Sequence, residues 1–249
     1  GGNGSGNMGV INHGEISTWG TGTITVYGKG GGTTGTATSG NHGVIVDGGE
    51  ISTENGTLSV TGYGGGTGPR NVGVGLSNTG TIHSWGSGTT GTVTVYGRGG
   101  GVSGTGTDEN YGIVVDGFES NASIGANSAN VSVTGYGGGT GYGNYGVYVP
   151  DGSIYANGGG DLTITGQGGG DPASTSSGNN HGVVIDGGTV SVVDGQLKVV
   201  GYGGNTAGST GANSGVEVWW NGRRDIGRIV ATGNGSVSVA GYGGDGGEG

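Results

Sequence analysis

The sequence predicts an all-β fold, a single-stranded parallel β-helix (β-solenoid) of about seven coils with three short strands in each coil. Three observations carry this prediction. A unit of the form N-x-G-V-x-V, a turn, an isolated Ile, a second turn, L-x-V-x-G and a glycine run recurs along the chain. Its period of 30–39 residues lies in the range of solenoids and propellers. Each unit holds three apolar segments separated by turn residues, as three short strands and three corners require.

The repeats span the whole chain without a linker or a break in composition, so residues 1–249 are interpreted as one β-solenoid domain. The seven repeats start at Asn7, Asn41, Asn71, Asn110, Asn144, Asn180 and Asn213.

The repeat that starts at Asn41 shows how the elements are expected to form. We expect strands over 43–46, 50–52 and 57–61, the second being too short to see without the repeat. Asp47-Gly48-Gly49 and Glu54-Asn55-Gly56 have the residue types of turns. A β-propeller is the competing architecture, but one blade needs four antiparallel strands. Three short strands and a long glycine tract favour the β-helix.

Composition excludes several classes of protein. Of the 249 residues 74 are glycine, and only the period separates such a chain from a disordered one. The net charge is −10 with no basic stripe, so nucleic acid is not an expected partner. Cysteine is absent, which excludes disulfides and thiolate metal sites. No apolar run is long enough for a transmembrane segment, and no signal peptide is recognisable in the sequence. Gly1 lies within repeat-like sequence, so we expect a segment of a longer protein or a processed form.

Stacking turns each repeat position into a column of side chains about 4.8 Å apart. The first column holds asparagine in all seven repeats. An Asn amide can donate to the next coil and accept from the previous one, so we expect an inward structural ladder.

A second column follows the third strand and alternates cations with aromatic rings in its first four members, an arrangement that favours cation–π contact. Its members are Lys29, Tyr63, Arg98, Tyr136, Gln167, Tyr202 and Tyr242. Tyr27 and Tyr96 stand two residues earlier in the coils that lack the later Tyr, and Trp19 and Trp85 belong to the same two coils. Such a surface stripe either covers the fold or binds sugar rings.

Acidic residues at the first corner are the weak candidates for a metal or a catalytic site. Asp116, Asp151 and Asp186 fall at or next to the same corner in three successive coils. Neighbouring carboxylates can bind Ca²⁺ or act as acid and base on a polysaccharide. Each also precedes Gly at a turn, where Asp is expected for conformational reasons. We therefore expect no enzyme and no cofactor, with calcium as the open alternative.

The outward positions of the third strand form a threonine-rich array that resembles the ice-binding face of antifreeze β-helices. The array comprises Thr23, Thr25, Thr57, Ser59, Thr61, Thr92, Thr94, Asn130, Ser132, Thr134, Thr163 and Thr165. Threonine is also a good strand former, so ice binding is a minor alternative.

The two ends of the solenoid are expected to expose strand edges. No capping segment is recognisable in Gly1–Gly6 or in Asp245–Gly249. Copies of the chain are therefore expected to stack head to tail. Repeat alignment places Glu15 and Arg228 in one column, so these opposite charges would meet at the junction.

The aligned repeats, such as 144–149 followed by 161–170, resemble those of large bacterial surface β-helix proteins, the filamentous-haemagglutinin-like and autotransporter-passenger group. The resemblance covers nearly the whole chain through the pattern N-x-G-V…L-x-V-x-G. It implies an extracellular or cell-surface location and a role in a fibre or adhesin. The alternative function is a carbohydrate-binding or carbohydrate-cleaving β-helix.

Overall fold

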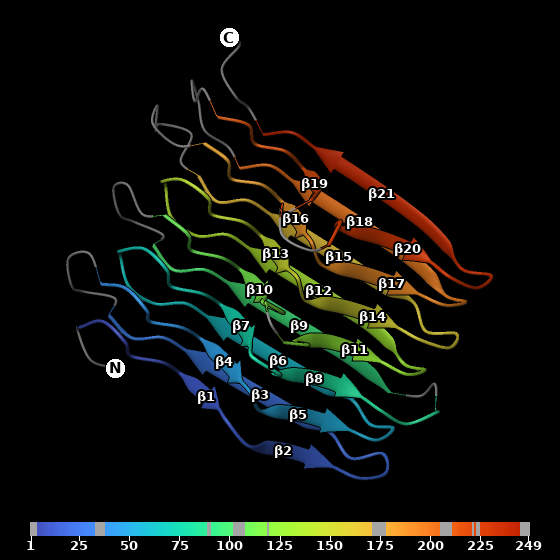
Figure 1. Cartoon of the computed structure of the whole chain (residues 1–249). Helices are drawn as coiled ribbons and strands as arrows, with labels where there is room; N and C mark the ends of the chain where they lie inside the picture. Colours follow the sequence, from blue (N-terminus) through green and yellow to red (C-terminus); the bar gives the residue numbers. More distant parts are fainter. Residues whose placement is uncertain are drawn as a thin grey trace.

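Three parallel β-sheets run side by side along the molecule and wind into one solenoid (Figure 1). The structure is a computed structural model that describes residues 4–32, 38–88, 91–101, 108–118, 120–170, 178–204, 211–220, 222 and 225–244. Every strand pairs in parallel with the strand of the same position in the next coil, for example Val44 with Val74. The expected parallel β-helix with three strands per coil is confirmed.

Each sheet takes one strand from every coil. Sheet A contains β1 (Val10–Asn12), β4 (Val44–Asp47), β7 (Val74–Ser77), β10 (Ile113–Val115), β13 (Val147–Pro150), β16 (Val183–Asp186) and β19 (Val216–Trp219). Sheet B contains β2 (Glu15–Thr18), β5 (Glu50–Thr53), β8 (Thr81–Ser84), β11 (Ser123–Ala126), β14 (Ser153–Ala156), β17 (Thr189–Val192) and β20 (Arg228–Ala231). Sheet C contains β3 (Ile24–Lys29), β6 (Leu58–Tyr63), β9 (Thr92–Arg98), β12 (Asn130–Tyr136), β15 (Leu162–Gln167), β18 (Gln196–Tyr202) and β21 (Ser236–Tyr242).

The core is a stack of aliphatic layers, one layer per coil. In the second coil the inward side chains of Val44, Val46, Ile51, Leu58 and Val60 have no exposed surface. Alternation of inward and outward residues in β4 and β6 places them there, as the period-two pattern predicts. The third strand continues past the expected 57–61 through Gly62 to Tyr63.

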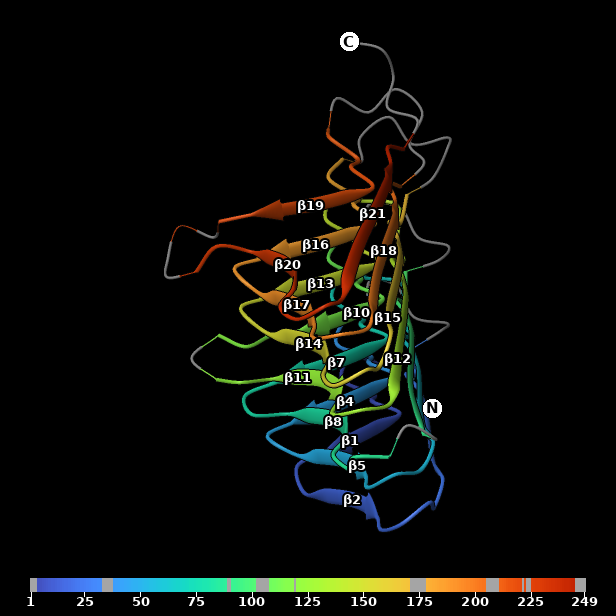
Figure 2. The ribbon, with the colours of Figure 1, turned by 90° about the vertical axis from the view of Figure 1, so that its right-hand side faces the viewer.

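The layers differ between the middle and the ends. Each sheet has seven strands, but only the five inner coils have a neighbour on both sides. About five turns are therefore enclosed, fewer than the seven coils counted from the repeats. Figure 2 shows the coils stacked from β2 at one end to β19 and β21 at the other.

Two glycine columns fix how closely sheets A and C approach. A Cβ on Gly62 would lie 2.1 Å from the carbonyl oxygen of Gly73, which belongs to the next coil. A Cβ on Gly43 would lie 2.3 Å from the backbone nitrogen of Tyr63. Any side chain at either position would collide with backbone, which explains why both repeat motifs, N-x-G-V and L-x-V-x-G, need glycine.

The described residues contain no helix, and so none that could cross a membrane. The corner between sheets A and B is enlarged in the seventh coil, where Trp220 and Ile226 form an isolated antiparallel bridge. Figure 2 shows β19 and β20 on either side of this corner, at the C-terminal end of the stack.

Candidate functional site

The asparagine column lies inside the solenoid and links each coil to the next. Asn41, Asn71, Asn110, Asn144 and Asn180 are fully buried. The backbone N–H of each ladder residue donates to the Oδ1 of the asparagine one coil further on. The N···O distances are 2.8–2.9 Å for the six rungs between Asn7 and Asn213.

These rungs differ from the expected chain of side-chain amides. The amide oxygen faces the neighbouring coil, whereas the amide nitrogen of Asn71 donates to the carbonyls of Thr38 and Gly68 at the adjoining loop. The first pair adds an amide-to-amide bond, from Asn7 Nδ2 to Asn41 Oδ1 at 3.2 Å. A backbone N–H cannot turn away from its acceptor, so the ladder sets both the stacking direction and the register.

The corner acids do not come together as a metal site. Among the described residues no group of three His, Asp or Glu side chains could hold a metal ion. Asp116 Oδ1 accepts the N–H of Phe118 at 3.0 Å, and Asp186 Oδ2 accepts the Tyr148 hydroxyl at 3.1 Å. Asp151 has a left-handed backbone with φ of 57°, as turn residues often do. The geometry at this corner is that of turn residues, and the calcium alternative gains no support from it.

The second column is in register along sheet C, from Lys29 through Tyr63 to Tyr242. Its rings contact other rings, because the tyrosines of two outward positions alternate. Tyr63 packs against Tyr27 and Tyr96, with centroids 5.8 and 5.7 Å apart, and Tyr96 packs against Tyr136 at 5.6 Å. Cations and rings alternate in the column as expected, but the ring–ring contacts join it to the neighbouring position and form a zigzag of tyrosines across four coils.

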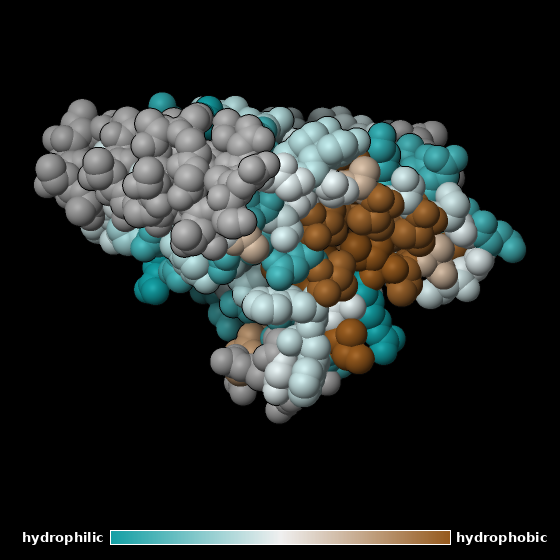
Figure 3. Space-filling model, turned by 90° about the horizontal axis from the view of Figure 1, so that it is seen from above, coloured by the Kyte–Doolittle hydropathy of each residue, from teal (hydrophilic) through white to brown (hydrophobic). Residues whose placement is uncertain are grey.

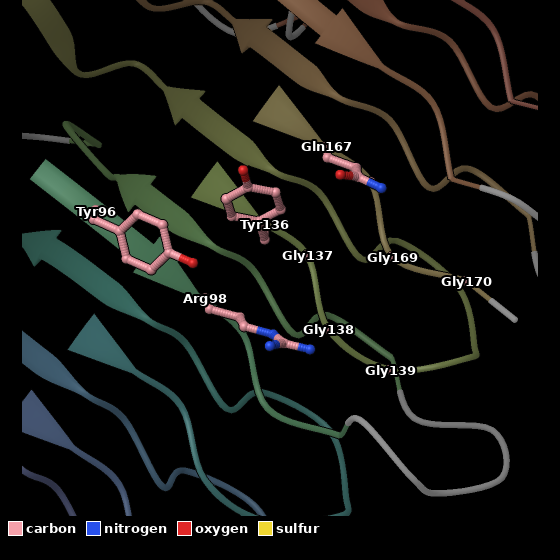
Figure 4. Close-up of a pocket in the computed structure, with 10 residues that line it drawn as sticks. Tyr96, Arg98, Tyr136, Gly137, Gly138, Gly139, Gln167, Gly169 and Gly170 are labelled. Atoms are coloured by element: carbon pink, nitrogen blue, oxygen red, sulfur yellow. The ribbon is translucent and has the colours of Figure 1, made fainter. Parts of the chain in front are cut away.

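A hollow of about 370 Å³ opens where this zigzag ends. Tyr96, Arg98, Tyr136 and Gln167 surround it, and bare backbone of the glycine tracts forms the rest of its wall. Figure 4 shows these side chains rising from neighbouring strands beside the two glycine turns. Gln167 interrupts the aromatic column here, and the rings resume with Tyr202 and Tyr242, which stack 4.9 Å apart.

The threonine-rich array lies on the same outward face of sheet C. Thr25 pairs with Ser59, and Ser59 with Thr94, one coil at a time. The bulky rings of Tyr27 and Tyr96 stand on this face beside the array, so it is not a continuous flat surface.

The last coil exposes the residues that form the core elsewhere. Val237 and Val239 of β21 are 44% and 49% exposed, whereas Leu197 and Val199, their partners in β18, are 1% and 0% exposed. Val218, Trp219, Trp220 and Ile226 of the same coil are also exposed. Seen along the solenoid in Figure 3, this end carries the brown, hydrophobic area.

The first coil is the other end of the stack. Its core residues Ile24 and Val26 are 8% exposed, so this end is less open than the last coil. Register through sheet B places Glu15 and Arg228 in one column, at its two ends. Residues 4–6 of the expected uncapped segments are described, whereas 1–3 and 245–249 lie outside the described residues.

An aromatic cluster on sheet A was not predicted. Tyr111 and Tyr145 stack 5.4 Å apart, Tyr148 packs against both, and the ring of His181 lies 5.3 Å from that of Tyr145. Burial raises the pKa of Tyr145 to about 12 and lowers the pKa of His181. The signal in the sequence is the residue after each ladder asparagine, which is Tyr111, Tyr145 and His181 in three successive coils.

No family model, no curated protein and no solved structure matches the chain. The structure is a parallel β-solenoid, and a function can be inferred only from the geometry of its own residues.

Proposed function

We propose that this protein is a structural repeat protein whose copies stack head to tail into an extracellular fibre or cell-surface adhesin. The observation that carries the proposal is the exposed core of the last coil. Val237 and Val239 occupy positions that are buried in every inner coil. A further coil laid on β19, β20 and β21 would bury them, just as the last coil buries Leu197 and Val199 of β18.

The first coil of a second copy is the occupant that fits this end. It is built from the same repeat, so its strands present the same spacing and register to β19, β20 and β21. In each inner coil the ladder Oδ1 accepts a backbone N–H from the preceding coil. Asn7 Oδ1 stands at the start of the ladder and accepts no hydrogen bond from the described residues. A preceding coil would use it as the other rungs are used.

The junction also joins complementary side chains. Stacked in the common register, Arg228 of one copy lies next to Glu15 of the other. Tyr242 meets Lys29 in the same way, because they are the two ends of the sheet C column. An exposed ion pair contributes about 0–1 kcal/mol, so these contacts select the register more than they supply affinity.

Affinity comes from burying the open layer. A half-exposed aliphatic side chain gains on the order of 1 kcal/mol when it is covered, and Val216, Val218, Ile229, Val237 and Val239 make up the layer. Parallel strand pairing in all three sheets adds to this. The two joined surfaces differ, so the contact does not close on itself and repeats into an open fibre.

Location and family are part of the same proposal. The repeat pattern resembles bacterial surface β-helix proteins, and a fibre of this kind acts outside the cell. No residue of the described part is assigned a catalytic role.

A charge reversal tests the junction. Arg228→Glu should weaken or misregister assembly in sedimentation velocity, and the added change Glu15→Arg should partly restore it. Lys198→Glu, on the outer face of an inner coil, makes the same change in net charge and should leave assembly intact. Equal sedimentation of all four proteins as monomers at high concentration would reject head-to-tail stacking.

A further inference from the structure

The residue before each ladder asparagine has a left-handed backbone in the first six coils. Three of these residues are glycine, Gly6, Gly40 and Gly143, with φ of 67–76°. The other three are Arg70, Glu109 and Asn179, with φ of 58°, 55° and 53°. Asn tolerates this conformation, whereas Arg and Glu rarely adopt it. Glycine at residues 70 and 109 would adopt this backbone without strain, so the presence of Arg and Glu there needs another explanation.

All three non-glycine side chains engage partners in one region. Arg70 Nε lies 2.6 Å from Glu109 Oε2, across adjacent coils. Asn179 Nδ2 donates to the Tyr142 hydroxyl at 2.5 Å. The Arg70–Glu109 pair is exposed, and an exposed ion pair adds little stability. The ion pair therefore does not offset the strain of the two left-handed residues. Backbone strain without a compensating gain in stability is typical of functional sites.

Two hollows adjoin at this ion pair. One, of about 320 Å³, is lined by Ser39, Pro69, Asp108 and Tyr142. The other, of about 300 Å³, lies over sheet A, with Ile45, Gly75 and Val114 on its floor and Tyr111 on its side. Arg70 and Glu109 line both. Together they form a trough of the size of a ligand site, with an ion pair at its centre.

The aromatic walls of the trough are held in place. Tyr142 is 53% exposed, yet its hydroxyl is fixed by Asn179, and its backbone N–H donates to Asp108 Oδ1 at 2.7 Å. On the other side Tyr111 is stacked on Tyr145. Rigid rings lose little conformational entropy when a ligand covers them.

We propose that this trough binds a neutral carbohydrate chain. A sugar hydroxyl both donates and accepts, so one hydroxyl can bridge the Arg70 guanidinium and the Glu109 carboxylate. The C–H faces of a pyranose fit the tyrosine rings and the apolar floor. Asp108, Glu109 and Asp116 outnumber Arg70, which disfavours uronic acids and phosphates. This site is separate from the stacking ends, so either proposal can fail without the other.

The test is calorimetric titration of the intact chain with neutral gluco-, manno-, galacto- and xylo-hexasaccharides, a polyuronate hexamer and decalysine. At least one neutral hexasaccharide should bind. Tyr142→Ala and Arg70→Gly should each weaken that binding by about tenfold or more. Tyr27→Ala is the matched control, because Tyr27 is 60% exposed on sheet C, and its variant should bind as the parent does.

Arg70→Gly separates a binding role from a structural one. It installs the residue that this backbone favours, so the melting temperature should stay the same or rise while binding is lost. The proposal is overturned if no neutral hexasaccharide binds, if the polyuronate or decalysine binds more tightly, or if Arg70→Gly keeps full affinity. An equal loss of affinity in Tyr27→Ala would overturn it as well.

Discussion

His181 Nε2 lies 2.9 Å from Glu217 Oε2, a residue of the next coil. The other ring nitrogen, Nδ1, lies 2.9 Å from the backbone nitrogen of Ser214, also in the next coil. A backbone N–H can only donate, so Nδ1 accepts and the proton of the neutral ring is on Nε2, facing the carboxylate. One neutral imidazole thus joins the sixth coil to the seventh through both nitrogens.

Protonation of His181 would oppose the bond from Ser214, because Nδ1 would then carry a proton of its own. Burial is the main cause that lowers the pKa of His181, while Glu217 raises it in part. The folded state therefore binds fewer protons than the unfolded state, whose His titrates near 6.5. Stability is full above about pH 6.5 and falls as the pH drops below it. The melting temperature should be lower at about pH 5 than at about pH 7.5.

Two variants isolate the contribution of His181, since burial lowers the pKa of His42 and His83 as well. His181→Asn keeps an acceptor for Ser214 and should show a smaller difference in melting temperature between the two pH values. His13→Asn, at an exposed histidine, should behave as the parent. An unchanged pH dependence in His181→Asn would show that this ring is not the titrating group.

The asparagine ladder predicts a clear mutational effect in a middle coil. Asn110→Ala removes the acceptor of the Asn71 N–H and leaves that buried group unpaired, at a cost of about 1–3 kcal/mol. Thr94→Ala, on the outer face of sheet C, should cost much less. Chemical denaturation measures both, and equal free energies of unfolding would argue against a structural ladder.

The close approach of sheets A and C predicts a larger effect. Gly62→Ala places a methyl group 2.1 Å from the Gly73 carbonyl, so backbone must move, at a cost on the order of 3 kcal/mol or more. At Gly14 a Cβ meets nothing within 4 Å, and Gly14→Ala is the matched control. Similar melting temperatures for the two variants would mean that the sheets separate more easily than their contacts indicate.

Metal removal should have no effect on stability. The corner acids Asp116 and Asp186 accept hydrogen bonds from the protein, and no described group of three ligands gathers near them. Adding a chelator such as EDTA should leave the melting temperature unchanged. A decrease that calcium reverses would show that these acids bind the ion after all.

The fold could be predicted from the sequence because every coil needs the same residue types at the same positions, so the pattern recurs in each repeat. A lone residue such as Ile51 does not identify a strand, but the same residue type at the same place in successive repeats does. The columns followed from the same alignment, and Glu15 and Arg228 share one as expected.

Which side chains of neighbouring coils contact each other was not accessible. Arg70 and Glu109 share one repeat position in adjacent coils, but their contact depends on a left-handed backbone, which only the glycines at equivalent positions, such as Gly40 and Gly143, could have suggested. Glu217 reaches His181 from a different repeat position, so an alignment of columns does not bring them together. Such contacts depend on how far a side chain extends toward the neighbouring coil, and a repeat pattern does not give this information.

Electron microscopy of the purified chain tests head-to-tail stacking most directly. The exposed layer of Val237 and Val239 predicts unbranched filaments of constant width, one solenoid across, that lengthen with protein concentration. The double variant Val237→Lys and Val239→Lys should remain as separate short particles, since charges in this layer prevent another coil from covering it. Separate particles for the parent chain at high concentration would contradict the proposal.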